Sequence, residues 1–331
     1  MNRKIKLGLV GAGGIAEFSH LPGIVSLDNV ELNAVCDVVE ERARKAAVKY
    51  NAKEVYTDYE EMIKKADIDA VDICTPVFLH APVAIEALKQ GKHVLVEKPL
   101  ARNSKEAETI VDAAMKSGRQ VSAMFNMRSM PVNIQIKNAI ENGDLGKIYM
   151  ARIRDGHSGP EVVMPYMGSW IFDKEKSGGG CVLDEIHDID LLCWWLGEVD
   201  SVSAEISTMA KKTEVEDNAA AILRFKSGAI ASMEISWTQI AGSGSTEIYG
   251  ERGVVISGDT YRIFRTETAG WFTPDLPSQS YWYWHRLQIK DFAQALIDNR
   301  PVPVPGEEAL TRLKIVDSIY LASKQGKKIT L

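Results

Sequence analysis

Residues 5–20 read IKLGLVGAGGIAEFSH, an apolar run interrupted by glycines and followed by helix formers. We interpret this stretch as a β-strand that leads through a tight turn into a helix. Gly11, Gly13 and Ala16 match G-x-G-x-x-G/A. In that pattern the first glycine permits the turn, the second lets the backbone approach a diphosphate, and the third small residue allows close helix–strand packing. The N–H groups at the start of the helix favour an anion, so the pattern predicts a dinucleotide site.

A second apolar stretch, Leu32 to Val35, ends at Cys36 and Asp37. An acidic residue roughly 20 residues beyond such glycines accepts hydrogen bonds from the adenosine ribose and repels a 2′-phosphate, so we predict NAD as the cofactor. Arg42 and Arg44 follow Asp37 and could hold a 2′-phosphate. NADP therefore stays an alternative, although both arginines fit the solvent face of a helix better.

Composition restricts the class of protein. The chain has 331 residues, enough for about two domains, with 45% hydrophobic and 25% charged residues and a net charge of −6. This charge argues against nucleic acid as a partner, and no apolar run is long enough to span a membrane. The first apolar run is too short and too rich in glycine for a signal peptide, and the four cysteines lack metal-binding spacing. We expect a cytoplasmic protein with a small-molecule partner.

The order of the predicted elements indicates an α/β fold. Strands alternate with helices over roughly the first 120 residues, which predicts a doubly wound parallel sheet with ligands at the carboxyl ends of its strands. Two such ends are Cys74-Thr75-Pro76 and Glu97-Lys98-Pro99. From Ser201 to Trp237 the residues alternate as in antiparallel strands, and two helices close the chain.

Four motifs together resemble the glucose–fructose oxidoreductase / inositol dehydrogenase / MocA (Gfo/Idh/MocA) family. They are the GAGGIA turn followed by His20, the CTP at residues 74–76, the EKPLA at residues 97–101, and SGGGCVLDEIHDIDLLCWWLG at residues 177–197. The resemblance implies an NAD(P)-binding Rossmann domain over residues 1–122. It also implies an α+β domain over residues 123–331 for substrate binding and oligomerisation, with a large, open, mainly antiparallel sheet. A homodimer or homotetramer would then form through that sheet.

The turn motif and the resemblance together give a set of expected cofactor contacts. His80 enters because it follows the CTP loop. Asn126 and Arg128 follow the last strand of the first domain, where they could equally be hinge residues. The expected contacts are Gly11, Gly13, Gly14, Ile15, Ala16, Asp37, Cys74, Thr75, Pro76, His80, Glu97, Lys98, Asn126 and Arg128.

The resemblance assigns the catalytic role to Lys98, whose ammonium can polarise a substrate hydroxyl. On one helix, Asp184 and His187 would be neighbours on the same face, so that Asp184 orients the imidazole that accepts the hydroxyl proton. The family commonly has one more residue between this aspartate and histidine, so Asp188 or Asp190 could replace Asp184. We expect no metal, because this chemistry needs no Lewis acid.

The substrate is expected to be a carbohydrate or polyol. Aromatic side chains pack on sugar C–H surfaces, and Trp170, Tyr283 and His285 are candidates for this role, together with Asp184 and His187. Arg154, Asp155 and His157 follow a predicted strand and are weaker candidates. We expect an NAD(P)-dependent dehydrogenase that oxidises a secondary hydroxyl of a sugar, sugar derivative or cyclitol. The alternatives are a glycoside hydrolase that uses NAD transiently and a non-catalytic sensor of dinucleotides.

Overall fold

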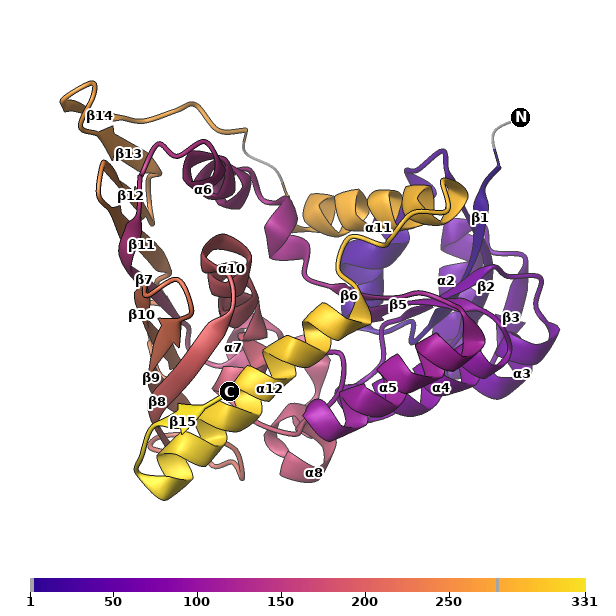
Figure 1. The fold of residues 1–331 in the computed structure, drawn as a ribbon. Helices are drawn as coiled ribbons and strands as arrows, with labels where there is room; N and C mark the ends of the chain where they lie inside the picture. The colour runs from indigo at the N-terminus through magenta and orange to yellow at the C-terminus, as the bar shows by residue number, and fades with distance from the viewer. Residues whose placement is uncertain (1–2, 278–279) are drawn as a thin grey trace.

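The computed structural model describes residues 3–277 and 280–331, which form two sheets with helices between and around them (Figure 1). The first sheet is parallel throughout, with strand order β3-β2-β1-β4-β5-β6. Its strands are β1 (Ile5–Val10), β2 (Val30–Cys36), β3 (Glu54–Tyr56), β4 (Ala70–Ile73), β5 (His93–Glu97) and β6 (Val121–Met124). All four residues of β4 are buried, as expected for a strand with helices on both faces of its sheet.

Helices connect these strands, and their ends follow capping rules. The side chain of Asp58 accepts hydrogen bonds from the N–H groups of Glu60 and Glu61 at the start of α3, and Gly118 ends α5 in a left-handed conformation. The connecting helices are α1 (Leu21–Val25), α2 (Glu40–Tyr50), α3 (Tyr59–Lys65), α4 (His80–Lys89) and α5 (Ser104–Ser117). A π-helical turn, Ala16–His20, precedes α1, and a 3-10 turn, Val77–Leu79, precedes α4.

The second sheet has the order β14-β13-β12-β11-β7-β10-β9-β8-β15 and is antiparallel except between β7 and β10. The predicted fold class is therefore confirmed. The strands are β7 (Ile148–Gly156), β8 (Val199–Ser207), β9 (Asn218–Phe225), β10 (Ile230–Ser236), β11 (Ser245–Gly250), β12 (Gly253–Ser257), β13 (Arg262–Arg265), β14 (Gly270–Phe272) and β15 (Ile329–Thr330).

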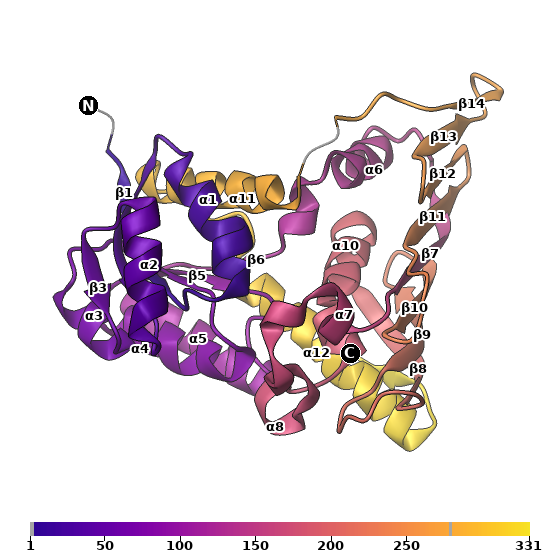
Figure 2. The ribbon, with the colours of Figure 1, turned by 180° about the vertical axis from the view of Figure 1, so that it is seen from behind.

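Only one face of this sheet is covered by helices in the part of the chain that the structure describes (Figure 2). In β9 the residues alternate, so that Ala221 and Leu223 are buried while Ile222 between them is 55% exposed. The helices of this half are α6 (Pro131–Glu141), α7 (Pro160–Val163), α8 (Lys174–Ser177), α9 (Cys181–Asp184), α10 (Ile186–Leu196) and α12 (Gly306–Gln325). Three 3-10 turns, Asn126–Ser129, Pro165–Met167 and Ser169–Phe172, complete it.

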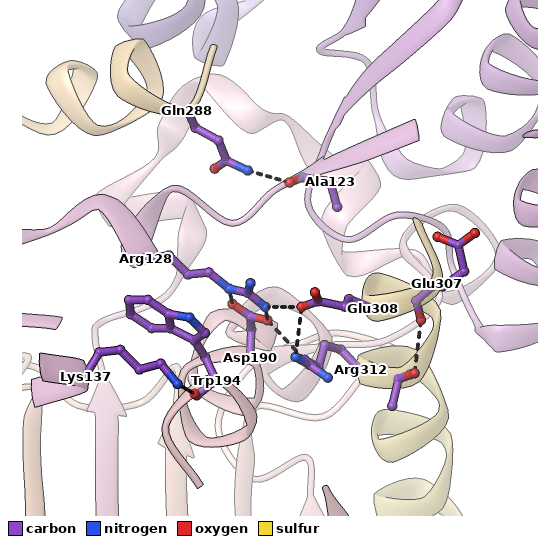
Figure 3. Close-up of polar contacts among 10 residues, drawn as sticks. Ala123, Arg128, Lys137, Asp190, Trp194, Gln288, Glu307, Glu308 and Arg312 are labelled. Carbon is purple, nitrogen blue, oxygen red and sulfur yellow. Dashed lines mark hydrogen bonds and ion pairs between the residues drawn. The ribbon is translucent and has the colours of Figure 1, made fainter. Parts of the chain in front are cut away.

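One late helix returns to the first sheet. Helix α11 (Tyr281–Ile297) packs beside α1, and its Ile289 and Phe292 are buried in one core with Leu7 and Leu9 of β1. Gln288 of this helix donates a hydrogen bond of 2.7 Å to the carbonyl of Ala123 on β6 (Figure 3). Among the described residues, no helix combines the length and apolar character needed to cross a bilayer.

Candidate active site

The glycine turn lies at the carboxyl end of β1, and each glycine has a different neighbourhood. Gly11 has a φ of +94°, and a Cβ there would lie 2.8 Å from the carbonyl of Cys74. A Cβ on Gly13 would meet no atom within 4 Å, so this side of the turn is open to a ligand. A Cβ on Gly14 would lie 2.1 Å from the ring of Tyr166, an aromatic side chain that sequence reasoning missed.

Asp37 closes the turn at the end of β2. Its carboxylate accepts hydrogen bonds from the N–H of Ala12 (2.9 Å) and of Val39 (2.8 Å). These bonds fix the carboxylate beside the glycines, where each oxygen keeps a further acceptor site for a ribose hydroxyl. Ile15 and Ala16 continue the turn into the helical segment, and Ala16 is fully buried.

The CTP and EKP loops are held together by His80. One ring nitrogen of His80 lies 2.8 Å from the carbonyl of Pro99 and the other 2.9 Å from that of Thr75. Burial lowers the pKa of His80, so the neutral ring donates to only one of these carbonyls at a time. The Thr75 hydroxyl is buried and has no hydrogen-bond partner among the described residues.

Lys98 joins the two halves of the chain. Its Nζ donates to Oδ1 of Asp184 at 2.9 Å and to the backbone carbonyl of Asp184 at 2.7 Å. Both side chains are largely buried, with 16% and 5% of their surface exposed. The other carboxylate oxygen of Asp184 is buried and accepts no hydrogen bond from the described residues.

The helix that carries Asp184 and His187 is interrupted, which differs from the expected single helix. Helix α9 ends at Asp184, and α10 begins at Ile186 after Glu185. At the break, the carbonyl of Asp184 accepts a hydrogen bond from Lys98, and the N–H of Asp188 donates to the carbonyl of Glu185. The Asp184 carboxylate therefore points to Lys98, and the structure shows no hydrogen bond between it and His187.

His187 is a buried imidazole without a described hydrogen-bond partner on either ring nitrogen. Its ring lies edge-on against Phe125, with 5.7 Å between the centroids. Burial, and then the charge of Lys98, lower the pKa of His187 well below 6.5. The ring is therefore neutral at physiological pH and can accept a proton.

Beneath Lys98 lies a buried network of charged groups. His20 contacts Asp72 through Nδ1 and Glu97 through Nε2, each at 2.8 Å. His285 of α11 lies 3.3 Å from the same Glu97, and Asn126 lies 3.2 Å from His285. His285 and Asn126 are each only 1% exposed, so both belong to this network.

Arg128 lies in a different network, shown in Figure 3. Its guanidinium makes two hydrogen bonds to Asp190, at 2.6 and 2.7 Å, and one to Glu308 at 2.8 Å. Arg312 completes the group with a 3.0 Å bond to Asp190. Four charges of alternating sign thus tie α10 and α12 to the segment after β6.

Two candidates remain, Trp170 and Tyr283. Trp170 is partly buried against the core of the second half. Tyr283 lies between Trp282 and Trp284, with the guanidinium of Arg286 5.7 Å from its ring centroid. Nothing in these contacts joins Trp170 or Tyr283 to Lys98.

Three groups of side chains have the donor types that metals prefer, with their atoms within 4.8 Å of one another. They are His20 with Glu97 and His285, His20 with Asp72 and Cys74, and His157 with Asp184 and Glu185. In the first two groups His20 already uses both ring nitrogens in hydrogen bonds to carboxylates.

The residues fit a nicotinamide dinucleotide. The open side of Gly13, the fixed carboxylate of Asp37 and the buried, unpartnered Thr75 hydroxyl lie at the carboxyl ends of parallel strands, where such ligands bind. Lys98 and His187 lie beside them. A Rossmann sheet with a lysine and a neutral histidine at the carboxyl ends of its strands is the arrangement of a dinucleotide-dependent oxidoreductase.

Comparison with known proteins gives the family. Residues 5–125 match the oxidoreductase family with an NAD-binding Rossmann fold, and residues 134–256 match the GFO/IDH/MocA C-terminal domain. The chain belongs to the Gfo/Idh/MocA family, as the motifs predicted, and it is an NAD-dependent oxidoreductase.

Individual relatives are similar over most of their length. The 1,5-anhydro-D-fructose reductase of Ensifer adhaerens is 30% identical over 252 residues, which cover 75% of this chain and 74% of that protein. The myo-inositol 2-dehydrogenase of Thermotoga maritima is 28% identical, and the match covers 92% of each protein.

Solved structures share the whole fold. The WlbA dehydrogenase of Bordetella pertussis, in complex with NADH and UDP-GlcNAcA, is 29% identical with a TM-score of 0.89, and the match covers 100% of this chain and 99% of that one. A levoglucosan dehydrogenase with NADH and levoglucosan has a TM-score of 0.92 over 99% of both chains at 24% identity.

Proposed function

We propose that this chain transfers a hydride between a secondary hydroxyl of a sugar, sugar derivative or cyclitol and NAD. The observation that carries the proposal is the Lys98–Asp184 pair beside the neutral, buried and unpartnered His187. The names of the relatives, an inositol dehydrogenase and an anhydrofructose reductase, support the same substrate class.

Each residue has a defined task in oxidation. NAD, when bound, accepts the hydride that leaves the substrate carbon. The Lys98 ammonium, held by Asp184, donates a hydrogen bond to the substrate oxygen and stabilises the negative charge that develops there. The hydroxyl proton passes to a ring nitrogen of His187, so the alcohol becomes a carbonyl with no covalent intermediate.

The cofactor contacts in the proposal are the residues of the turn and the two loops. Gly11, Gly13, Gly14, Ile15 and Ala16 provide backbone near the diphosphate, and Asp37 binds the ribose. Cys74, Thr75, Pro76, His80, Glu97 and Asn126 line the carboxyl edge near the nicotinamide. We assign Arg128 to the hinge rather than to the cofactor, because its guanidinium is engaged by Asp190 and Glu308.

The domain division and assembly remain part of the proposal. We assign residues 1–122 to the NAD-binding domain and 123–331 to the substrate domain, with α11 packed on the former. On the uncovered sheet face Met150 and Ile222 are 52% and 55% exposed, which supports a dimer through this face. The four cysteines are buried free thiols, which supports a reducing compartment such as the cytoplasm.

The test is the absorbance of NADH when the purified protein meets NAD and a panel of inositols, aldoses, amino sugars and sugar acids. A rise with one substrate class supports the proposal. No reduction with any substrate, while NAD binds, would contradict it. Release of aryl alcohol from nitrophenyl glycosides would then identify a glycoside hydrolase.

A further inference from the structure

A second group of charged side chains lies beside Lys98. Asp155 lies near the end of β7 and His157 directly follows this strand. Asp184 ends α9, Glu185 forms the break, and Asp188 lies in α10. His157 Nε2 lies 3.1 Å from Glu185 Oε1, and these two residues and Asp184 have ligand atoms within 4.8 Å of one another. Asp184 links the group to Lys98.

The fold explains why these residues meet. Asp155 follows Ala151 and Ile153 at alternate positions of β7, and both of those residues are buried on the face that α10 covers. Asp155 therefore points toward α10. The interruption at Glu185 places its carboxylate next to His157.

The charges of the group do not balance. Lys98 is paired with Asp184 and His157 with Glu185. No ion pair joins Asp155 or Asp188 to any described residue, and Oδ2 of Asp188, a residue only 3% exposed, is buried without a hydrogen-bond partner. Four carboxyl groups thus face one ammonium, that of Lys98, and the imidazole of His157.

Buried carboxyl groups close together do not all ionise. Burial, and then the charge of Glu185, raise the pKa of Asp155 to about 7. Burial, and then the charges of Asp155 and Glu185, raise the pKa of Asp188 well above its usual value. At neutral pH the group therefore retains protons that a bound cation would displace.

We infer that Asp155, Glu185 and Asp188 bind the ammonium group of the substrate, which is then an amino sugar or an amino cyclitol. This inference rests on the proposed function and narrows its substrate class. An ammonium has three donors and no acceptor, which matches ionised carboxylates that only accept. The side chains of His157 and Glu185 are 15% and 11% exposed, so the group borders solvent beside Lys98.

A divalent metal fits the group less well. A metal needs a neutral imidazole as ligand. Burial has the largest single effect on the pKa of His157 and lowers it, but the hydrogen bond and charge of Glu185 together with the charges of Asp184 and Asp155 raise the pKa above 6.5. Both ring nitrogens of His157 are already engaged, because Nδ1 accepts a hydrogen bond of 3.0 Å from the N–H of Gly159 and Nε2 lies 3.1 Å from Glu185 Oε1, so neither is free to bind a metal.

The test compares matched amine and hydroxyl ligands. Calorimetric titration of the NADH-bound enzyme at pH 7 in two buffers of different ionisation enthalpy measures the protons exchanged on binding. The ligands are glucosamine, galactosamine and an inosamine, each beside its neutral hydroxyl counterpart. We expect at least one amine to bind about tenfold more tightly than its hydroxyl counterpart and to release protons on binding. The Asp155→Asn variant should reduce both this difference in affinity and the number of protons released. Turnover is measured with the same pairs, and the wild-type ratio of kcat/KM is expected to favour that amine.

Several results would overturn the inference. One such result is that no amine binds more tightly than its hydroxyl counterpart and none releases protons, although neutral sugars are oxidised. That result would leave the proposed function intact. Another is tight binding of Mn²⁺ or Zn²⁺ that Glu185→Gln abolishes, with no amine preference. Failure to reduce NAD with any ligand would contradict the proposed function instead, and the calorimetric result would still decide the inference.

Discussion

Lys98 and Asp184, 86 positions apart in the sequence, form a hydrogen-bonded ion pair of 2.9 Å, and Lys98 also binds the backbone carbonyl of Asp184 at 2.7 Å. The carboxylate expected to orient His187 therefore holds Lys98, the lysine to which we assign the catalytic role. Because the carbonyl is used as well, the position of Lys98 depends on the break between α9 and α10.

Replacing Lys98 should abolish most of the activity. Lys98→Met removes the ammonium that stabilises charge on the substrate oxygen, and we expect kcat/KM to fall about 100-fold or more. Steady-state reduction of NAD with the substrate found in the panel measures this. Lys116→Met, on the exposed side of α5, is the matched control and should stay near wild type. Equal activity of the two variants would contradict the assigned role.

We predict that His187 sets the acidic limit of the oxidation reaction. The pKa of His187 lies well below 6.5, so its ring is neutral at pH 6.5 and above. Protonation of His187 should therefore cause no loss of kcat/KM between pH 8 and pH 6.5. The loss should begin only at lower pH, where the ring gains a proton. His187→Gln should lower kcat about 100-fold and remove this acidic limb. An acidic limb that survives in the variant would assign the base elsewhere.

The sequence predicts the parts of this site that depend on local pattern. The glycine turn, Asp37 and the parallel strands follow from spacing and periodicity within short segments. The break at Glu185 could not be predicted, because residues 181–196 contain no Gly or Pro that would mark it and the side chain that binds the Asp184 carbonyl, Lys98, is remote in sequence. The same holds for Arg128, whose partners Asp190 and Glu308 lie 62 and 180 positions away. The sequence shows Asp155 and His157 after a predicted strand, but only the folded structure shows that His157 contacts Glu185.

The charged group around Asp190 should stabilise the hinge. Asp190→Asn leaves Arg128 and Arg312 without their shared carboxylate at a buried position, and we expect a loss of about 3–5 kcal/mol in the free energy of unfolding. Urea denaturation followed by circular dichroism measures it. Glu61→Gln removes an exposed ion pair with Lys65 and should change stability by about 0.5 kcal/mol or less. A similar small change for Asp190→Asn would show that the network contributes little.

Gly14 and Tyr166 should be energetically coupled. Gly14→Ala places a methyl group 2.1 Å from the Tyr166 ring, and such overpacking costs about 1–3 kcal/mol. In the Tyr166→Ala background the same substitution should cost at least about 1 kcal/mol less. Gly13→Ala is the control, since its methyl group would meet no atom within 4 Å. Additive effects in the double variant would mean that Tyr166 does not contact the turn in solution.

His20 should stabilise the fold most at low pH. Burial has the largest single effect on its pKa and lowers it, but the charges and hydrogen bonds of Asp72 and Cys74 together outweigh burial and hold the pKa of His20 well above 6.5. The folded state thus binds a proton that the unfolded state loses near pH 6.5, and stability falls as pH rises through the folded pKa. The difference in unfolding free energy between wild type and His20→Gln should be largest near pH 6 and shrink toward pH 9. A difference that grows with pH would reverse the assigned sign.

The return of α11 to the first sheet limits how this protein can recombine with its relatives. A crossover near residue 122 would exchange one wall of the nucleotide domain along with the substrate domain. The incoming helix would have to bring residues that fill the space around Leu7 and Leu9, and a histidine able to reach Glu97. A hybrid that receives residues 123–331 from a relative must therefore also have an α11 that fits the first sheet. Hybrids that keep residues 281–304 from the same protein as the first sheet should be the ones that fold.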